Sequence, residues 1–509
     1  MPFHRSLAAL LLAVAFASPV AALAQDGRPD AKPRAEQAEK SAPFEAQRTV
    51  TRHSLALPSG ALAYTAVAEF LPVREAGKDE VLARVFTTTY TADGAEPRRR
   101  PVAFVFNGGP GAASAYLHLG ALGPKVVRFN EDGSLPRPPV PMVDNPDTWL
   151  AFTDLVFIDP VGTGYSRALK DGEDAEKRFW KVDADTRYLS EIVRLWVVRN
   201  DRWSSPKLLV GESYGGFRVA KMAGELFQRA GVAVNALVMV SPVLDFGTIA
   251  DEGTGLLTDA FKLPSMAAGA AAHGRIEGSS PAEAAERAER FALTGWLSGV
   301  ATLDIGRLDA SAGLFAEVAQ MIGLPVEMVA RHRGRVPARV FARELLRDKG
   351  RVLSVYDAAF TGPDLNPGSP RVREDPYLSG TVPVYSTAFT SYVQQELNFR
   401  TEVPFRLLNQ AVSRGWEWPR QGHASAMEEL RTVLGLTPGL HAMIAHGRND
   451  LVTPYLASRW LAAQIELPPE QRGRIRVPVY DGGHMMYTLA GPRARLAADT
   501  RALLDDALR

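Results

Sequence analysis

The chain has no cysteine among its 509 residues, which excludes disulfide bonds, thiol nucleophiles and thiolate metal sites. It also has no excess of charge of either sign. The formal net charge is +1, so nothing favours a nucleic acid or an anionic surface as a partner. Internal repeats, metal-ligand spacings and glycine-rich nucleotide-binding motifs are absent, and we predict neither a metal nor a cofactor. The remaining composition, 46% hydrophobic and 23% charged, is that of a globular protein with a large core.

Long apolar runs are absent except for a short one near the N-terminus. Arg5 precedes the apolar run of residues 7–16, and the small residues Ala22 and Ala24 follow it. This pattern is typical of a secretory signal peptide, because the run is too short for a membrane span, and we predict cleavage after Ala24. Residues 25–49 are polar and contain several prolines, which predicts a disordered linker. Export without cysteine indicates a periplasmic or secreted protein of bacterial type.

One serine lies in the sequence context of a catalytic nucleophile. Residues 208–210 are apolar and predict a buried strand, Gly211 to Gly215 form a G-x-S-x-G turn, and a helical pattern starts at Phe217. A bare G-x-S-x-G also occurs by chance, but this strand–turn–helix context is typical of a nucleophile whose hydroxyl is exposed at a sharp turn. The following helix directs its N-terminus at the serine and favours negative charge there. We therefore predict that Ser213 is the nucleophile of an α/β-hydrolase-type sheet.

A serine hydroxyl needs a general base, and that base needs a carboxylate to orient it. In α/β-hydrolases these groups occur in the order serine, acid, histidine, each in a loop after a strand. His484 follows the last predicted strand, residues 474–480, and Asp450 follows the strand predicted over 440–445. We therefore predict a triad of Ser213, Asp450 and His484. Asp481 is the alternative acid, although it is so close to His484 in sequence that a role in the turn is expected.

A glycine-rich loop follows the strand predicted over 102–106. Its sequence runs from Asn107 through Gly108, Gly109 and Pro110 to Gly111. In this fold the corresponding loop supplies one backbone N–H of the oxyanion hole, and the residue after the nucleophile supplies the other. We predict Gly109 and Tyr214 as these two donors. A simple tight turn is the alternative reading of the loop alone.

The order of predicted elements indicates an α/β fold. Residues 61–67 and 81–90 predict an antiparallel meander, and later apolar strands alternate with helical segments. We expect an α/β-hydrolase fold with a mostly parallel central sheet, helices on both faces and an inserted helical cap. The core would comprise residues 50–245 and 436–509. The cap would comprise residues 246–435, where the alternation stops and a capping box at Ser280–Glu283 opens a helix.

Taken together, these segments resemble the serine carboxypeptidase family, in its bacterial form. The matches are the loop from Asn107, the turn around Ser213, Asp450 in Gly-Arg-Asn-Asp-Leu-Val, and His484 in Gly-Gly-His-Met. The resemblance runs from about residue 102 to the C-terminus. It implies hydrolysis of C-terminal bonds of peptide substrates through an acyl-enzyme on Ser213. It also implies a site for the substrate carboxylate that contains Asn107, Gly108 and Glu212.

The chain departs from this family at two positions of the carboxylate site. A tryptophan is replaced by Val105, and a second glutamate is replaced by Ala121. Without that like-charged neighbour Glu212 loses one cause of a raised pKa, although burial would still raise it. We expect a modest preference for a free C-terminal carboxylate, unless another side chain takes over the role. A serine esterase or acyltransferase, and a non-catalytic binding protein, are the alternative functions, because a fold does not fix the reaction.

Overall fold

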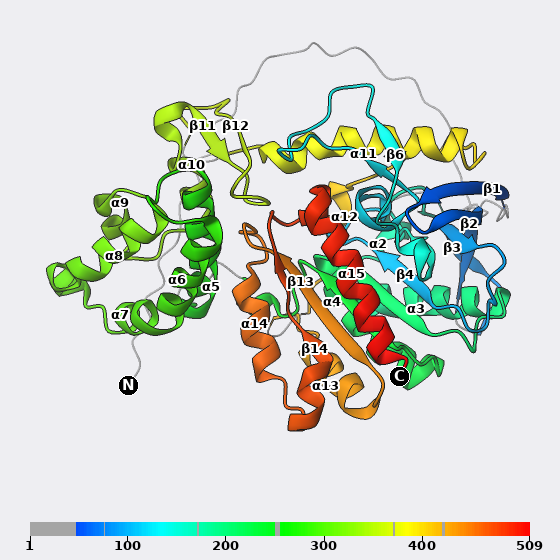
Figure 1. Cartoon of the computed structure of the whole chain (residues 1–509). Coiled ribbons are helices and arrows are strands. Elements are labelled where there is room, and N and C mark those ends of the chain that lie inside the picture. Colours follow the sequence, from blue (N-terminus) through cyan, green and yellow to red (C-terminus); the bar gives the residue numbers. More distant parts are fainter. Residues whose placement is uncertain (1–46, 76, 171–172, 250–254, 370–371, 420–422) are drawn as a thin grey trace, which may run out of the picture. The chain divides into compact units, whose positions relative to one another are not determined.

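The computed structural model describes residues 47–75, 77–170, 173–249, 255–369, 372–419 and 423–509. The predicted signal peptide and most of the predicted linker lie outside these ranges. An 11-stranded sheet organises the described residues, with the main order β1-β2-β3-β7-β4-β9-β10-β13-β14 (Figure 1). No helix within the described ranges is long and apolar enough to cross a membrane.

The first three strands form the predicted antiparallel meander. They are β1 (Arg48–Leu57), β2 (Gly60–Arg74) and β3 (Val81–Ala92). Strand β1 begins two residues earlier than predicted, inside the segment assigned to the linker. β3 continues the sheet by pairing antiparallel with β7.

The centre of the sheet is parallel and buried. Its strands, in spatial order, are β7 (Asp154–Ile158), β4 (Val102–Phe106), β9 (Lys207–Glu212), β10 (Ala236–Val240) and β13 (His441–Gly447). Nearly every residue of these strands is buried, as is usual for parallel strands covered on both faces. The structure thus confirms the predicted mostly parallel sheet.

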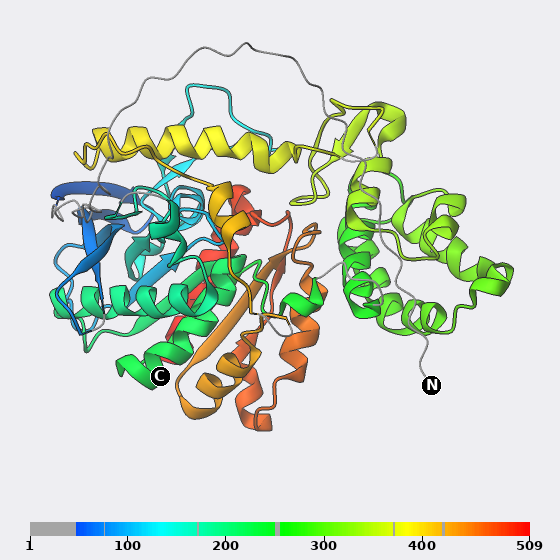
Figure 2. The ribbon, with the colours of Figure 1, turned by 180° about the vertical axis from the view of Figure 1, so that it is seen from behind.

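Helices cover both faces of this sheet, and alternate side chains of each strand contribute to two cores. Leu208 and Val210 pack in one core with α15 (Ala490–Ala507) and α11 (Pro376–Gln395). Leu209 packs in the other core. Its helices are α3 (Val182–Arg199), α4 (Tyr214–Glu225) and α13 (Met427–Leu436). Figure 1 shows α15 in front of the sheet, and Figure 2 shows α3 and α4 on the opposite side. Each fully buried Leu or Val contributes about 1.5–3 kcal/mol to this packing.

The predicted extent of one strand was wrong. The strand predicted over 474–480 is two short strands, β14 (Ile475–Arg476) and β15 (Val479–Tyr480), which both pair with β13. Pro478 separates them because proline has no N–H for the ladder. Lys181 occupies the N-cap position of helix α3, and Asp183 lies in the first turn. Helix α15 starts at Ala490, before Pro492.

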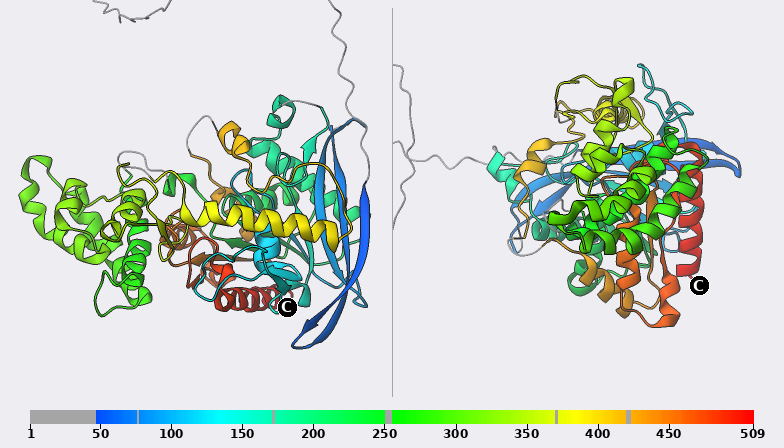
Figure 3. Two further views of the ribbon diagram at one scale, coloured as in Figure 1. Left: turned by 90° about the horizontal axis from the view of Figure 1, so that it is seen from above. Right: turned by 90° about the vertical axis from the view of Figure 1, so that its left-hand side faces the viewer.

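The residues predicted as a cap divide into two parts. The first part has its own hydrophobic core with Trp296 and Phe341. It includes α5 (Leu256–Ala272), α6 (Pro281–Phe291), α8 (Ala312–Ile322) and α10 (Ala338–Glu344). The predicted capping box at Ser280 opens α6. This group contacts α14 (Tyr455–Gln464), where Phe261 packs on Trp460. The second part, with α11 and α13, packs on the main sheet (Figure 3).

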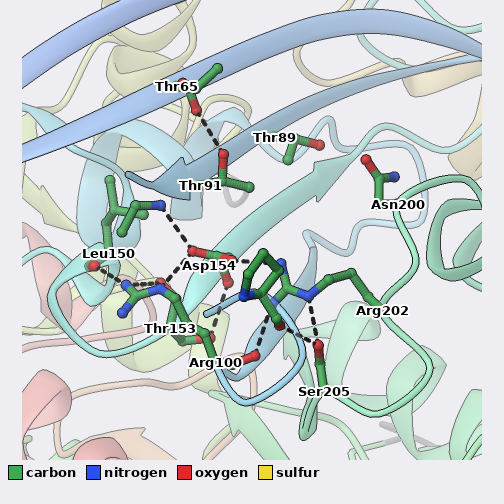
Figure 4. A network of polar contacts seen from close by, with 12 residues as sticks. Thr65, Thr89, Thr91, Arg100, Leu150, Thr153, Asp154, Asn200, Arg202 and Ser205 are labelled. Carbon is green, nitrogen blue, oxygen red and sulfur yellow. Dashed lines mark hydrogen bonds and ion pairs between the residues drawn. The ribbon is translucent and has the colours of Figure 1, made fainter. Parts of the chain in front are cut away.

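A buried cluster of ion pairs joins the amino-terminal ends of two parallel strands (Figure 4). Arg100 donates from Nε to Asp154 Oδ1 at 2.7 Å. Arg202 Nη1 donates to the other oxygen of Asp154 at 2.7 Å, and its Nη2 donates to the Arg100 carbonyl at 2.7 Å. Asp154 begins β7 and Arg100 precedes β4, so this cluster anchors the sheet at the end opposite the glycine-rich loop and the nucleophile turn.

We predict that Asp154→Ala lowers the free energy of unfolding by about 3–5 kcal/mol, because it leaves buried guanidinium groups without a counter-charge. Urea denaturation followed by circular dichroism measures the change. Glu191→Ala is the matched control, since Glu191 forms an ion pair with Arg194 on the exposed side of α3 and should cost less than about 1 kcal/mol. Equal effects of the two substitutions would contradict the structural role of the cluster.

Candidate active site

The predicted catalytic residues lie in loops at one edge of the sheet. Ser213 follows β9, Asp450 lies three residues after the end of β13, and His484 lies four residues after the end of β15. Strands β9, β10 and β13 are parallel neighbours, so their carboxyl ends meet at this edge. The topology therefore brings all three residues of the predicted triad to the same region.

Ser213 lies at a sharp turn with strained backbone. Its φ of 58° and ψ of −124° are rare for a residue other than glycine. The turn is so tight that a Cβ on Gly211 would lie 2.0 Å from the Gly215 carbonyl oxygen. A hydrogen bond of 2.9 Å from Ser213 N to the Val240 carbonyl ties the turn to β10. This strain persists because the surrounding sheet and helix hold it, as the G-x-S-x-G pattern predicted.

His484 and Asp450 form a buried pair. His484 Nδ1 lies 2.7 Å from Asp450 Oδ2, and because a carboxylate only accepts, Nδ1 carries the proton and Nε2 remains an acceptor. The backbone N–H groups of Val452 and Thr453 donate to Asp450 Oδ1 at 2.8 and 3.0 Å. Burial disfavours the charged imidazole, but the Asp450 carboxylate outweighs it and raises the pKa of His484.

The alternative acid, Asp481, is engaged elsewhere. Its side chain is 67% exposed and forms ion pairs with Arg448 and, at 3.6 Å, with Arg495. Asp450, in contrast, is fully buried against His484. The geometry favours Asp450 as the residue that orients the histidine.

A segment from the insert holds both the acid loop and the histidine loop. We call residues 354–358 the clamp segment. His484 N donates to the Tyr356 carbonyl at 2.6 Å, and Leu451 N donates to the Val355 carbonyl at 3.0 Å. The Tyr356 ring also stands edge-on to the His484 ring, with 5.3 Å between centroids. No sequence motif marks this segment, which lies about 100 residues before the loops it contacts.

The clamp segment is itself held by polar contacts at its start. Ser354 Oγ donates to Asp375 Oδ1 at 2.8 Å and accepts from the Tyr356 N–H at 2.9 Å. Asp375 Oδ2 accepts from Val355 N at 2.9 Å, and Asp375 also caps the N-terminus of α11. The insert therefore fixes the backbone of the histidine loop through a chain of hydrogen bonds.

A second buried carboxyl group lies directly before the serine. Glu212 is 3% exposed, and its Oε2 accepts hydrogen bonds from Asn107 Nδ2 at 2.5 Å and from Tyr487 Oη at 2.8 Å. Burial raises the pKa of Glu212 to about 7, although His484 and the two donors oppose the rise. Asn107 is oriented by the Leu117 N–H, which donates to its Oδ1 at 3.0 Å. The predicted residues Asn107 and Glu212 are thus in contact, whereas Tyr487 was not predicted.

The glycine-rich loop packs against the nucleophile turn. A Cβ on Gly108 would lie 2.6 Å from both the Glu212 carbonyl oxygen and Tyr214 N, so only glycine fits there. Gly109 has a φ of 100°, which favours glycine, and among the described residues its N–H has no acceptor. The loop and the turn therefore meet at the N–H of Tyr214. The roles of Gly109 and Tyr214 as oxyanion donors stay a prediction.

The other polar groups of this region do not form a metal site. Within the described ranges, no three His, Asp or Glu side chains are placed to hold a metal ion. His118 stacks on Phe157 with 3.9 Å between ring centroids, and its Nε2 lies 2.7 Å from Tyr90 Oη.

We predict that Ser354→Ala lowers kcat/KM by about tenfold, because a looser clamp segment misplaces His484 relative to the serine. Initial rates on any turned-over substrate, together with the thermal midpoint, measure this effect. Ser265→Ala is the matched control, since Ser265 is equally buried and its hydroxyl has no partner among the described residues. Full activity of Ser354→Ala would show that the clamp segment does not position the histidine.

The comparisons with known proteins concern the fold and the segments around the nucleophile turn. The family model described as serine carboxypeptidase matches residues 68–283, which include the glycine-rich loop and the nucleophile turn. Among solved structures, Kex1, a prohormone-processing carboxypeptidase from Saccharomyces cerevisiae, is 16% identical, with coverage of 86% of this chain and 91% of that chain and a TM-score of 0.53.

An esterase from Thermogutta terrifontis is 11% identical, with coverage of 90% of this chain and 99% of that chain and a TM-score of 0.31. No curated protein matches the chain. The likeness to Kex1 shows the α/β-hydrolase fold, and the family model matches the segments that carry the nucleophile turn. The chain is therefore a serine hydrolase whose residues 68–283 match the serine carboxypeptidase family.

Proposed function

We propose that the chain is a serine carboxypeptidase that removes C-terminal residues from peptides. The observation that carries the proposal is Glu212, a buried carboxyl group directly beside Ser213 and hydrogen bonded to Asn107. The hydrogen bonds of this carboxyl group go to Asn107 and Tyr487 and not to His484, the base that activates the serine, although its charge helps to raise the pKa of His484. The carboxyl group can, however, recognise the free carboxylate that distinguishes the end of a peptide from its interior.

In the proposed reaction Ser213 Oγ attacks the carbonyl carbon of the last peptide bond. His484 Nε2 accepts the hydroxyl proton, while Asp450 holds Nδ1–H and stabilises the imidazolium. The N–H groups of Gly109 and Tyr214 would stabilise the oxyanion, and one such donor contributes about 2.7–4 kcal/mol. The imidazolium then protonates the leaving amine, and water releases the acyl group in the second half of the cycle.

The charge of Glu212 determines when the substrate carboxylate is bound well. An ionised Glu212 would repel it, whereas a neutral Glu212 can donate a hydrogen bond to it. Because burial raises the pKa of Glu212 to about 7, the neutral form prevails below neutral pH. Asn107 and the Gly108 backbone complete the proposed site, although Asn107 already uses its amide to contact Glu212.

Residues 246–435 act as a cap over this site in our proposal. Support comes from the clamp segment, which lies within this range and contacts the His484 loop. A cap of this kind would favour short peptides over folded proteins. The predicted signal peptide would place the enzyme in the periplasm or outside the cell, where it would act on peptides.

We predict that Ser213→Ala, His484→Ala and Asp450→Asn each reduce kcat by about ten-thousand-fold to a million-fold while the protein stays folded. Steady-state kinetics with a blocked dipeptide measure the loss. Asp481→Asn is the matched control for the acid and should retain nearly full activity. Inactive Asp481→Asn together with active Asp450→Asn would contradict the assigned triad.

A second prediction concerns the ratio of kcat/KM for a blocked dipeptide acid to that for its C-terminal amide. His484 titrates in both reactions, so it cancels in the ratio, whereas Glu212 acts only on the acid. The ratio should therefore be about ten- to a hundredfold below pH 6 and fall as the pH rises through about 7, when Glu212 ionises. A ratio that is constant from pH 5 to pH 9 would contradict recognition by Glu212.

A further inference from the structure

Tyr487 contacts the buried carboxyl group from the histidine loop. It lies three residues after His484 in the short helix η9 (Met486–Thr488), and its side chain is fully buried. Its hydroxyl donates to Glu212 Oε2 at 2.8 Å, the oxygen that also accepts from Asn107 Nδ2. Among the described residues no donor reaches the other oxygen, Oε1.

We infer that Tyr487 selects Oε1 as the protonated oxygen of Glu212 and so acts as a specificity-determining residue for the C-terminal carboxylate. The inference rests on the proposed function. An oxygen that accepts two hydrogen bonds has both of its lone pairs engaged, so a proton added to Glu212 goes to Oε1. That O–H has no acceptor among the described residues, so it can donate a hydrogen bond to the substrate carboxylate.

Tyr487 lies close to the segment in which the family's second glutamate is replaced by Ala121. The π-helix η1 (His118–Leu122) contains Ala121 at that position and packs against η9. A Cβ on Gly120 would lie 2.6 Å from Tyr487 Cε2 and 2.6 Å from Tyr385 Oη, so the two rings fit only because residue 120 is glycine. The tyrosine therefore packs against the segment that would carry the glutamate while its hydroxyl contacts Glu212.

A tyrosine differs from a second carboxyl group in its effect on Glu212. Two carboxyl groups would share a proton, and their repulsion would raise one pKa. The Tyr487 hydroxyl is neutral, and burial together with the nearby Glu212 charge raises its pKa well above the usual value, so it remains a donor. Its hydrogen bond favours ionised Glu212 and limits the rise in pKa that burial causes.

The other ionisable groups that face Glu212 come from five parts of the chain. The histidine and acid loops contribute His484 and Asp450, helices α1 (Ala115–Leu117) and α11 contribute tyrosines, and the clamp segment contributes one more. These tyrosines are Tyr116, Tyr377, Tyr385 and Tyr356. The Tyr385 hydroxyl has no hydrogen-bond partner among the described residues, which makes it a suitable control.

The test measures the acid-to-amide ratio of kcat/KM from pH 5 to pH 9 for Tyr487→Phe, Tyr385→Phe and the wild type. Loss of the Tyr487 hydroxyl should lower the ratio at acidic pH by about two- to tenfold, because the proton is no longer confined to Oε1. The midpoint at which the ratio falls should move to higher pH, since a hydrogen bond to the ionised form is lost. The amide reaction alone should stay within about twofold, and Tyr385→Phe should match the wild type.

An unchanged ratio and midpoint in Tyr487→Phe would overturn the inference, and so would an equal loss for acid and amide, which indicates a structural role. If the wild type itself shows no preference for the acid, the proposed function fails together with the inference. Should Tyr487→Phe not fold, Gly120→Ala serves instead, because its methyl group displaces the Tyr487 ring and predicts the same changes.

Discussion

The hydrogen bonds that converge on Glu212 connect the three segments from which the site is built. Glu212 ends β9 and precedes the strained serine, Asn107 begins the glycine-rich loop, and Tyr487 belongs to the histidine loop. A buried carboxyl group is costly to leave without partners, so its two donors have to stay in place. Burial of this one group therefore constrains the relative position of all three segments.

Other parts of the chain support this arrangement from outside the α/β core. The clamp segment binds the backbone of the His484 loop, and its own start is held by Asp375 at the N-terminus of α11. The insert thus contributes to the catalytic geometry in addition to its own hydrophobic core. Strain at Ser213 is tolerated because the adjacent β10 binds its backbone N–H.

Local patterns were sufficient to predict most of the fold. Apolar runs with turn residues at their ends located the parallel strands, and the strand–turn–helix pattern located the turn at Ser213. The order of motifs identified Asp450 and His484, which the structure brings into contact. Even the error at β14 and β15 was local, since it concerns how Pro478 interrupts a strand.

Contacts between distant segments could not be predicted from the same patterns. Nothing in the sequence distinguishes Tyr487 from an aromatic residue of the core. Only the fold shows that its hydroxyl donates to Glu212, 275 residues earlier. The clamp segment has no motif because it acts through backbone carbonyl groups, which every residue possesses. No local pattern indicates the ion pair between Arg100 and Asp154, which lie 54 residues apart. Such contacts depend on tertiary packing that no single segment encodes.

The central claim is that the buried carboxyl group beside Ser213 directs the enzyme to the end of a peptide. Digestion of a defined peptide library, with the products identified by mass spectrometry over time, tests it most directly. The account predicts that single amino acids are released stepwise from the C-terminus. It also predicts that nothing is released from peptides in which only the interior bonds are accessible. Internal fragments as the first products, or hydrolysis of esters with intact peptides, would contradict it.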